Sequence, residues 1–476
     1  MKICFISAEA EPFAKSGGLG DVLGALPKAL AERHEVKVIM PKYKFIPDRY
    51  AQNMRQILSN VSVILGWRRQ SCNVWSLSMN GVEYYFIESS YYFGGDKIYD
   101  QFDLERFCFF SKAALEILVH LDYRPDVLHC NDWSTAIVPV MLDCFYMGMG
   151  FYRNMRTVIT IHNLQYQGIF DIAEVMDKTG LPGYYFSHDK LEFYGRANLL
   201  KGGIVYANEV TTVSPSYAGE IMSDEYGEGL QSLMRARRNH LHGILNGVDY
   251  TTYNPETDEL IERNYSVADY AEGKAYNKKQ LKKQLGLPNT AVPLIGLVSR
   301  LYDQKGLDLI TCVMEDIVRE DLQMVILGTG DLRYEEAFRY YAAEYREKVA
   351  SVIGFDNRLA HRIYAGCDLF LMPSRFEPCG LSQMISMKYG TLPIVREVGG
   401  LKDSVKSYNQ YTGEGNGFSF TNYNAHDMLY TLRRALHFYY DDEKAFDRII
   451  RNAMAEDYSW SQSAKKYESI YEELIN

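Results

Sequence analysis

Lys2-Ile3-Cys4-Phe5-Ile6-Ser7-Ala8-Glu9-Ala10-Glu11-Pro12-Phe13-Ala14-Lys15-Ser16-Gly17-Gly18-Leu19-Gly20-Asp21 begins with a continuous apolar run and ends in a glycine-rich turn. Ile3 to Ser7 has the length and composition of a strand that is buried on both faces. An apolar helical pattern follows from Val22, and Pro27 should kink that helix. The order of strand, glycine loop and helix start predicts an α/β unit in which free backbone N–H groups can meet an anion.

The same alternation of strand and helix continues along the chain. Further strands are predicted at Val36 to Met40, Tyr84 to Ile87, Val127 to Cys130, Val158 to Ile161 and Val210 to Val213. The pattern then restarts, with strands at Leu294 to Ser299, Met324 to Leu327, Ser351 to Ile353, Leu369 to Met372 and Leu392 to Val395. Strands that alternate with helices form parallel, doubly wound sheets. We therefore expect an α/β fold with two Rossmann-like parallel-sheet domains that face a central cleft.

The domain boundaries follow from where the second series of strands begins. We expect a first domain over 1–245, a second over 246–458, and a terminal segment over 459–476. Ser459 provides a capping signal for a last helix, which is expected to pack back on the first domain.

Composition excludes several classes of protein. The 476 residues carry a net charge of -10, which argues against a nucleic-acid binder. The eight cysteines are scattered without a Cys-x-x-Cys pair, so a reducing cytoplasm fits best. No run has the length of a membrane span, and the N-terminus does not have the pattern of a signal peptide.

The loop around Lys15 is the first candidate for binding an anion. Gly17 and Gly18 allow the chain to approach a phosphate closely, and Lys15 adds a charge. The loop is neither a G-x-G-x-x-G nor a Walker motif. Taken alone, it is equally consistent with a tight turn that carries an exposed lysine.

A second candidate loop follows the first strand of the second series. It contains Arg300 and Lys305. A guanidinium binds phosphate oxygens through two bonds and an ammonium adds a mobile charge. The alternative interpretation is a surface loop with two solvated cations.

A third loop, Pro373 to Ser382, also stands at a strand exit and leads into a predicted helix over Ser382 to Tyr389. Glu377 suits the hydroxyl groups of a polyhydroxyl ligand, and the N–H groups of the helix start suit hydroxyl or phosphate oxygens. Cys379 is interpreted as a structural or backbone contact, because nothing in its spacing to a histidine indicates a nucleophile.

Two histidines end strands of the first series. His162 leaves the same sheet edge as Lys15 and is therefore a candidate site residue, whereas His129 lies one residue inside its strand and is interpreted as structural. No cluster of metal-ligating side chains lies at a strand exit, so the sequence predicts no metal site. We expect lysine and arginine side chains to neutralise the negative charge of the ligand in place of a metal cation. We also expect no cofactor.

Together these segments closely resemble the bacterial glycogen synthase and plant starch synthase family, which are retaining glucosyltransferases of the GT-B fold. The matching stretches appear in the family's order across almost the whole chain: Lys15 to Asp21, Thr160 to Leu164, Ile244 to Asp249, Arg300 to Asp308, Gly328 to Asp331, Pro373 to Gln383, Tyr389 to Arg396, Gly399 to Asp403 and the terminal Y-S-W-S-Q-S-A.

The resemblance implies ADP-glucose as donor and the non-reducing end of an α-1,4-glucan as acceptor. It implies that Lys15, Arg300 and Lys305 hold the diphosphate. It also implies that Glu377 orients the glucose hydroxyls, and that His162 orients the end of the glucose that carries the 6-hydroxyl. The remaining positions that it assigns to substrate are the amides of Gly18, Cys379, Gly380 and Leu381, Asn246 near the sugar, Asp21 and Ser382 at ribose and phosphate, and Phe355 stacked on adenine.

Some positions depart from the family's pattern. The family usually has threonine at the positions that Ser16 and Ser382 occupy here. It commonly has histidine at the position of Ser134, which in the family lies near the acceptor side. Many retaining GT-B enzymes have a second glutamate at the position that Ile385 occupies here. Glycogen synthases also lack this glutamate, so its absence fits that subgroup.

The mechanism and the class of activity each leave alternatives. No carboxylate is nominated for a double displacement, so a front-face internal return is the preferred hypothesis. The rival activities are a sucrose- or trehalose-type synthase that uses UDP-glucose, a glucan phosphorylase, and a catalytically silent glucan-binding module.

Overall fold

The computed structural model describes all 476 residues, and the chain divides into two compact units. Unit 1 comprises Met1–Val213, Ala218–Gly247 and Trp460–Asn476. Unit 2 comprises Ser214–Tyr217 and Val248–Ser459.

Unit 1 is built on a nine-stranded sheet with the order β12-β11-β7-β6-β1-β2-β5-β4-β3. Every neighbouring pair from β12 to β5 is parallel. The strands are β1 (Lys2–Ile6), β2 (Glu35–Pro41), β3 (Arg55–Leu65), β4 (Arg68–Met79), β5 (Val82–Glu88), β6 (Val127–Asn131), β7 (Arg156–Ile161), β11 (Glu209–Thr212) and β12 (Leu241–Gly243).

The parallel part of this sheet reverses direction at β1. Counted along the chain without β3 and β4 and read from β5, its spatial order is 3-2-1-4-5-6-7, as in a doubly wound nucleotide-binding fold with one strand more. All residues of β1 after Lys2 and all residues of β6 are buried, because helices cover both faces of such a sheet. Ligands bind such sheets beyond the carboxyl ends of the strands at the reversal, which here falls between β1 and β6.

The edge strand β12 was not predicted, and neither were two larger parts of unit 1. Strands β3 and β4 form an antiparallel hairpin that adds to the sheet edge at β5. A separate three-stranded sheet has the order β8-β10-β9, with β8 (Ile169–Phe170), β9 (Glu192–Phe193) and β10 (Arg196–Asn198). The hairpin strands are long but mostly exposed or half-buried, so they lack the continuous apolar run by which the other strands were found.

The helices of unit 1 lie between these strands in sequence. They are α1 (Gly18–Ala31), α2 (Asp48–Ala51), α3 (Ser90–Phe93), α4 (Asp103–His120), α5 (Ile137–Met141), α6 (Ile172–Thr179), α7 (Leu199–Tyr206), α9 (Gln231–Ala236) and α19 (Trp460–Ile475), while α8 (Pro215–Glu220) has its first residues in unit 2. Helix α1 continues as one element through the buried Pro27, so the proline does not end it.

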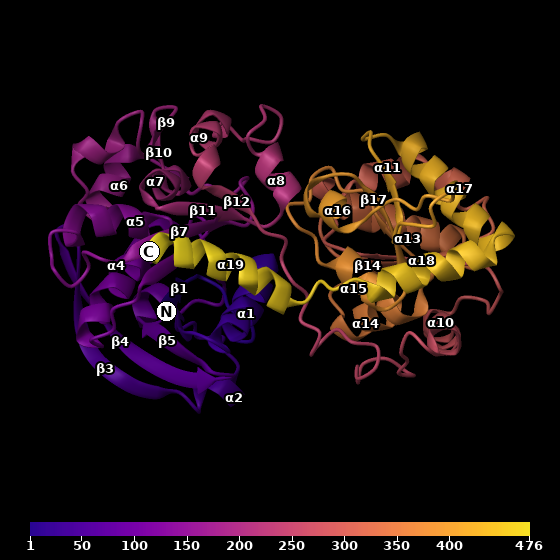
Figure 1. The fold of residues 1–476 in the computed structure, drawn as a ribbon, viewed down its shortest axis with the longest axis horizontal. Helices are drawn as coiled ribbons and strands as arrows, with labels where there is room; N and C mark the ends of the chain where they lie inside the picture. The colour runs from indigo at the N-terminus through magenta and orange to yellow at the C-terminus, as the bar shows by residue number, and fades with distance from the viewer. The chain divides into compact units, whose positions relative to one another are not determined.

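The last helix, α19, belongs to unit 1 although it follows unit 2 in sequence. It lies beside α1, the yellow and indigo ribbons in Figure 1. Glu468 accepts hydrogen bonds from Arg33 at 3.0 Å and pairs with His34 Nε2 at 2.8 Å. Tyr471 places its hydroxyl 2.6 Å from His129 Nδ1 at the centre of the sheet. The C-terminal segment is therefore part of the core of unit 1.

Unit 2 contains a six-stranded sheet in which every neighbouring pair is parallel, with the order β15-β14-β13-β16-β17-β18. The strands are β13 (Leu294–Val298), β14 (Gln323–Gly328), β15 (Val349–Ile353), β16 (Leu369–Met372), β17 (Leu392–Arg396) and β18 (Phe418–Phe420). Counted along the chain, this order is 3-2-1-4-5-6, the Rossmann order, and its reversal falls between β13 and β16.

The helices of unit 2 are α10 (Tyr270–Leu285), α11 (Leu307–Cys312), α12 (Met314–Ile317), α13 (Leu332–Glu344), α14 (Asn357–Gly366), α15 (Ser382–Lys388), α16 (Gly399–Ser404), α17 (Ala425–Asp441) and α18 (Glu443–Ala455). The predicted fold class, α/β with two Rossmann-like parallel sheets, is confirmed. None of the helices is long and apolar enough to cross a membrane.

Candidate active site

The predicted site residues follow the carboxyl ends of strands in both units. In unit 1, the Lys15 loop follows β1 and His162 follows β7. In unit 2, the Arg300 loop follows β13 and the Glu377 loop follows β16, the two strands at the reversal. Each unit therefore presents candidate residues at the edge where doubly wound sheets bind ligands.

Lys15 is held between two carboxylates. Its Nζ lies 2.8 Å from Glu11 Oε2 and 2.5 Å from Asp21 Oδ1. Burial by itself lowers the pKa of Lys15, but the charges and hydrogen bonds of Asp21 and Glu11 outweigh it, and the net pKa is raised. Burial raises the pKa of Asp21 despite this partner. Lys15 is therefore a fixed cation near neutral pH, with Asp21 in direct contact as part of the same loop.

A buried glutamate that sequence reasoning missed organises this loop. The Glu9 carboxylate accepts hydrogen bonds from the Ser16 backbone N–H and hydroxyl, both at 2.6 Å, and from the Gly17 N–H at 3.3 Å. The Tyr99 hydroxyl also donates to it at 2.8 Å. Glu9 is only 3% exposed. Glu9 thus occupies the backbone donors of Ser16 and Gly17, which leaves Gly18 as the next amide in sequence, at the first position of α1.

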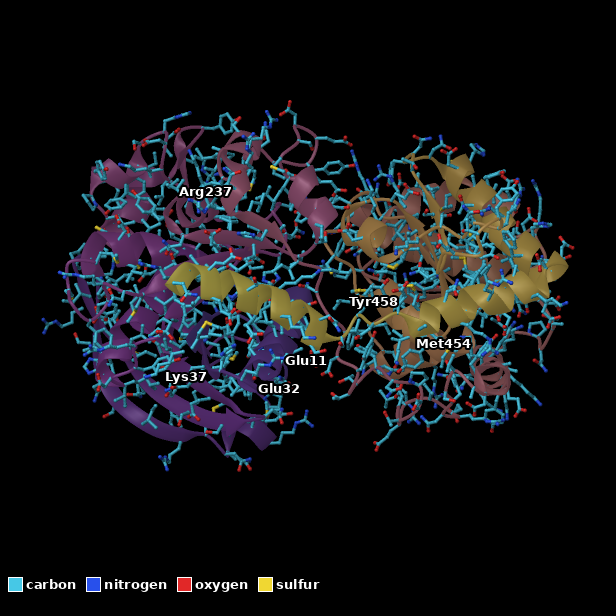
Figure 2. The ribbon with its side chains drawn as sticks, in the orientation of Figure 1. Glu11, Glu32, Lys37, Arg237, Met454 and Tyr458 are labelled. Carbon is cyan, nitrogen blue, oxygen red and sulfur yellow. The ribbon has the colours of Figure 1, made fainter.

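The glycines of the loop fall into two kinds. A Cβ added at Gly17 or Gly18 would meet no protein atom within 4 Å, and neither has a positive φ. At Gly20 the added Cβ would lie 2.8 Å from Lys15 Cγ. Packing therefore requires glycine at Gly20 but not at Gly18. Glu11, labelled in Figure 2, closes the other side of the turn through its backbone N–H, which donates to the Gly20 carbonyl at 3.1 Å.

His162 is a neutral imidazole in a polar network at the ends of β6 and β7. Burial lowers the pKa of His162 to about 3. Its Nε2 lies 3.0 Å from Asn131 Oδ1, and its backbone N–H donates to Asp132 Oδ1 at 2.7 Å. No hydrogen bond joins His162 to the Lys15 loop.

Asp132 is a second residue whose role sequence reasoning did not bring out. Its backbone has a positive φ of 56°, in the left-handed region. Burial raises the pKa of the Asp132 carboxyl to about 7, and the nearby Glu9 charge acts in the same direction. A carboxyl with a pKa near neutrality at a strand end is typical of functional sites.

His129 and Asn246 have different surroundings. His129 is fully buried, with Nε2 at 2.5 Å from Thr160 Oγ1 in addition to its contact with Tyr471, as expected for a structural histidine. Asn246 is 5% exposed, and its Oδ1 has no hydrogen-bond partner in the protein. A buried acceptor of this kind is costly unless a ligand or water donates to it.

In unit 2 the structure brings two predicted residues into direct contact. Lys305 Nζ lies 2.6 Å from Glu377 Oε2, and the Ser374 hydroxyl donates to the same oxygen at 3.0 Å. Glu377 is 6% exposed. The two loops meet because Gly306, with φ of 67°, accepts the close approach of the Pro373 carbonyl, which would lie 2.0 Å from an added Cβ. Arg300 is exposed on the same loop as Lys305 and forms no ion pair.

The loop that follows Glu377 is pinned by the start of α16. The Gly400 N–H donates to the Glu377 carbonyl at 3.1 Å, and a Cβ on Gly399 would lie 2.0 Å from that oxygen. Cys379 is 6% exposed and Gly380 has a φ of 69°. Leu381 precedes α15 directly, so the backbone from Cys379 to Leu381 leads into a helix N-terminus.

Ser382 and Phe355 complete the predicted set. The Ser382 hydroxyl accepts a hydrogen bond from Tyr364 at 3.1 Å. Phe355 follows β15 and is 91% exposed, so no side chain covers its ring. The structure places Phe355 on a different loop from Glu377 and shows no contact between them. No group of three or more histidine, cysteine, aspartate or glutamate side chains is arranged to hold a metal ion.

Two Rossmann-type units, with a lysine and carboxylates at the strand ends of each, are the architecture of the GT-B class of glycosyltransferases, which the family matches of this chain show. Comparison with known protein families supports this class. The family model of the starch synthase catalytic domain matches residues 2–236, and the family model of the glycosyl transferases group 1 matches residues 277–455.

Similar proteins cover the whole chain. The glycogen synthase of Lachnospira eligens is 51% identical over 476 residues, 99% of each chain. That of Geobacillus stearothermophilus is 52% identical over 478 residues, 100% of this chain and 98% of its own. The catalytic domain of starch synthase IV from Arabidopsis thaliana, solved with ADP and acarbose bound, superimposes with a TM-score of 0.93 at 35% identity, covering 100% of this chain and 99% of that one. The chain belongs to the glycogen synthase and starch synthase family of glycosyltransferases.

Proposed function

We propose that this chain transfers glucose from ADP-glucose to the non-reducing end of an α-1,4-glucan and retains the anomeric configuration. The single observation that carries the proposal is the ion pair between the half-buried Lys305 and the buried Glu377 at the sheet reversal of unit 2, 2.6 Å apart. A pair of this kind combines a cation for a phosphate with a carboxylate for sugar hydroxyls. The full-length similarity to glycogen synthases and the ADP bound to the starch synthase IV structure support ADP-glucose as donor.

The diphosphate is the part of the donor that needs positive charge. We assign Lys15, Arg300 and Lys305 to it. Arg300 is exposed and without an ionic partner, so its guanidinium can form two bonds to phosphate oxygens. Lys305 and Lys15 are already held by carboxylates, which fixes the position of each ammonium before the donor arrives. Positive charge held in place stabilises the departing ADP without reorganisation in the transition state.

The sugar and the nucleoside use the remaining residues. Glu377 is assigned to the glucose hydroxyls and His162 to the 6-hydroxyl end, with Asn246, whose Oδ1 has no protein partner, nearby. Phe355 is assigned to the adenine, because its ring is 91% exposed and aromatic faces stack on bases. The other substrate contacts are assigned to the amides of Gly18, Cys379, Gly380 and Leu381 and to the side chains of Asp21 and Ser382.

The same geometry favours a front-face mechanism. A double displacement needs a carboxylate that is free to attack the anomeric carbon. One oxygen of Glu377 is engaged by both Lys305 and Ser374, which suits a carboxylate that orients hydroxyls. We therefore favour departure of ADP and attack by the glucan hydroxyl on the same face, with the departing diphosphate taking the proton of the acceptor.

The experiment is a donor comparison. The purified chain is incubated with glycogen and either ADP-glucose or UDP-glucose, and release of ADP or UDP is measured. We expect release from ADP-glucose. A sucrose- or trehalose-type synthase lacks its acceptor in this mixture, so preferential release from UDP-glucose would instead make UDP-glucose the donor for the glucan. No release from either donor contradicts transfer to a glucan and favours a glucan-binding module. The scattered cysteines, none of them in a disulfide, lead us to propose that the reaction takes place in a reducing cytoplasm.

A further inference from the structure

The amide of Asn131, at the end of β6, has only one possible orientation. Its Nδ2 lies 3.3 Å from the Ile6 carbonyl oxygen and 3.2 Å from the His129 carbonyl oxygen. A carbonyl oxygen only accepts hydrogen bonds, so the group that faces both must be the NH2. The reversed amide would place an oxygen against two oxygens in a position that is 1% exposed. The hydrogen-bond network alone therefore assigns nitrogen and oxygen.

This orientation decides which nitrogen of His162 carries the proton. The Oδ1 of Asn131 lies 3.0 Å from His162 Nε2 and has no proton to give, so Nε2 must donate. Burial lowers the pKa of His162 to about 3, which keeps the ring neutral near pH 7. A neutral imidazole with a proton on Nε2 has a bare lone pair on Nδ1. The structure shows no hydrogen bond to Nδ1.

The backbone of His162 is held as well. The His162 backbone N–H donates to Asp132 Oδ1 at 2.7 Å, and Asp132 is itself held by its backbone N–H to the Thr160 carbonyl at 2.9 Å. Asn131 is anchored in addition through its backbone N–H, which donates to the Thr135 hydroxyl at 2.6 Å. The tautomer of His162 and the position of its backbone are thus both set by residues of the β6–β7 strand ends.

We infer that Asn131 is a positioning residue: it holds His162 in the Nε2–H tautomer so that Nδ1 accepts a hydrogen bond from a sugar hydroxyl. In this arrangement Nδ1 of His162 is the acceptor of that hydrogen bond. The tautomer is a property of the free protein, whereas the sugar as its ligand rests on the proposed function.

The direct test of the tautomer is nitrogen NMR of the full chain labelled at histidine, with the signals of His162 identified by their loss in His162→Gln. We expect a protonated Nε2 and an unprotonated Nδ1 throughout the neutral pH range. A proton on Nδ1, or a mixture of tautomers, overturns the inference. This result does not depend on any activity.

The second test asks whether the tautomer matters for the reaction. Asn131→Ala removes the acceptor at Nε2, so we expect mixed tautomers and a loss of kcat/KM for the donor of about 10-fold, the size expected for one hydrogen bond. Asn163→Ala is the matched control, because the Asn163 side chain accepts a hydrogen bond from the Gln165 N–H at 3.0 Å and forms no hydrogen bond with the His162 ring. The histidine spectrum of this variant should match that of the wild type. If Asn131→Ala folds with the original tautomer, or with mixed tautomers and full activity, the positioning role is wrong.

The two proposals fail separately. If the wild-type chain transfers no glucose but shows the Nε2–H tautomer, the proposed function falls and the assignment of the tautomer stands. If transfer is normal and the tautomer is the other one, the role of Asn131 falls and the proposed function stands.

Discussion

Lys305 Nζ lies 2.6 Å from Glu377 Oε2, although the two residues are 72 positions apart in the sequence. They meet because the strands that precede them, β13 and β16, are neighbours at the reversal of the unit 2 sheet. The side chains are 17% and 8% exposed, so each charge depends on the other for compensation. Binding and stability are therefore coupled at this pair, and a double-mutant cycle can separate them.

Glu377→Gln and Lys305→Gln should each lower the free energy of unfolding, by about 1–3 kcal/mol, because each leaves one buried charge without its partner. The double variant should recover part of this loss, since neither charge remains. Activity should not recover. All three variants should lose kcat/KM by about 100-fold or more, with the loss falling mainly on kcat for Glu377→Gln and on the KM for donor for Lys305→Gln.

The control for this cycle is Glu320→Gln, which removes a half-exposed ion pair to Arg433. We expect a stability change of about 0–1 kcal/mol and normal kinetics. An unchanged apparent affinity for the donor in Lys305→Gln would refute the assignment of this lysine to the diphosphate.

Gly18→Ala tests whether that glycine serves a ligand or the fold. An added methyl group meets no protein atom within 4 Å, and alanine favours a helix start, so stability should stay the same or rise by about 0.5–1 kcal/mol. The KM for donor should nevertheless rise. Gly20→Ala is the comparison, because its methyl group meets the Lys15 side chain at 2.8 Å and should lower both stability and activity. Normal donor kinetics in Gly18→Ala would show that no phosphate approaches this position.

Glu9→Gln should disturb the Lys15 loop, because the Glu9 carboxylate holds the backbone of that loop. The carboxylate accepts from four donors, and an amide would turn a donor toward some of them. We expect the free energy of unfolding to fall by about 1–3 kcal/mol and the KM for donor to rise. Glu32→Gln, an exposed glutamate at the end of α1 that is labelled in Figure 2, should change neither quantity. A stable Glu9→Gln with an unaltered KM would mean that the loop does not depend on this carboxylate.

Asp132→Asn should change how stability depends on pH. The pKa of Asp132 is raised to about 7 in the folded protein, against about 3.9 in an unfolded chain. The folded protein therefore binds this proton more tightly, and the stability that it contributes is present at low pH and lost as the pH rises from about 4 to about 7. Asparagine does not ionise and tolerates a positive φ.

The thermal midpoint measured across this range checks the prediction for Asp132. The midpoint of Asp132→Asn, relative to that of the wild type, should increase between pH 4 and 7 and stay constant above pH 7. A difference between the two midpoints that does not change with pH would contradict the raised pKa.

The sequence predicted most strands of the two parallel sheets, because each of these is a continuous apolar run between polar ends. It did not predict β12 and β18, edge strands of only three residues each. It did not predict the β3–β4 hairpin, whose residues are partly exposed on both faces and therefore show no such run. Helix α1 continues through the buried Pro27, so this proline does not end the helix, and the kink expected there stays a prediction. Whether an edge strand is buried depends on tertiary contacts, which the periodicity of the sequence does not contain.

The candidate site was predictable where its residues stand at strand exits. Lys15, Arg300, Lys305 and Glu377 were nominated in this way, and the structure confirms that each lies on a loop that follows a strand. The side chains that hold these residues in place could not be predicted from the sequence. Glu9 acts through donors that only the folded loop brings together, and Asp132 depends on a positive φ and on burial. Strand order is not contained in the local pattern either, so the contact between Lys305 and Glu377 required the structure.

The most direct test of the central claim follows the transferred sugar itself. Glycogen is incubated with ADP-glucose that carries radiolabelled glucose, and the polymer is then treated with an enzyme that cleaves only α-1,4 linkages from non-reducing ends. The account predicts that the wild-type chain incorporates label, that this treatment releases all of it, and that Glu377→Gln incorporates about 100-fold less. Label that is absent from the polymer, or that resists this cleavage, would contradict the account.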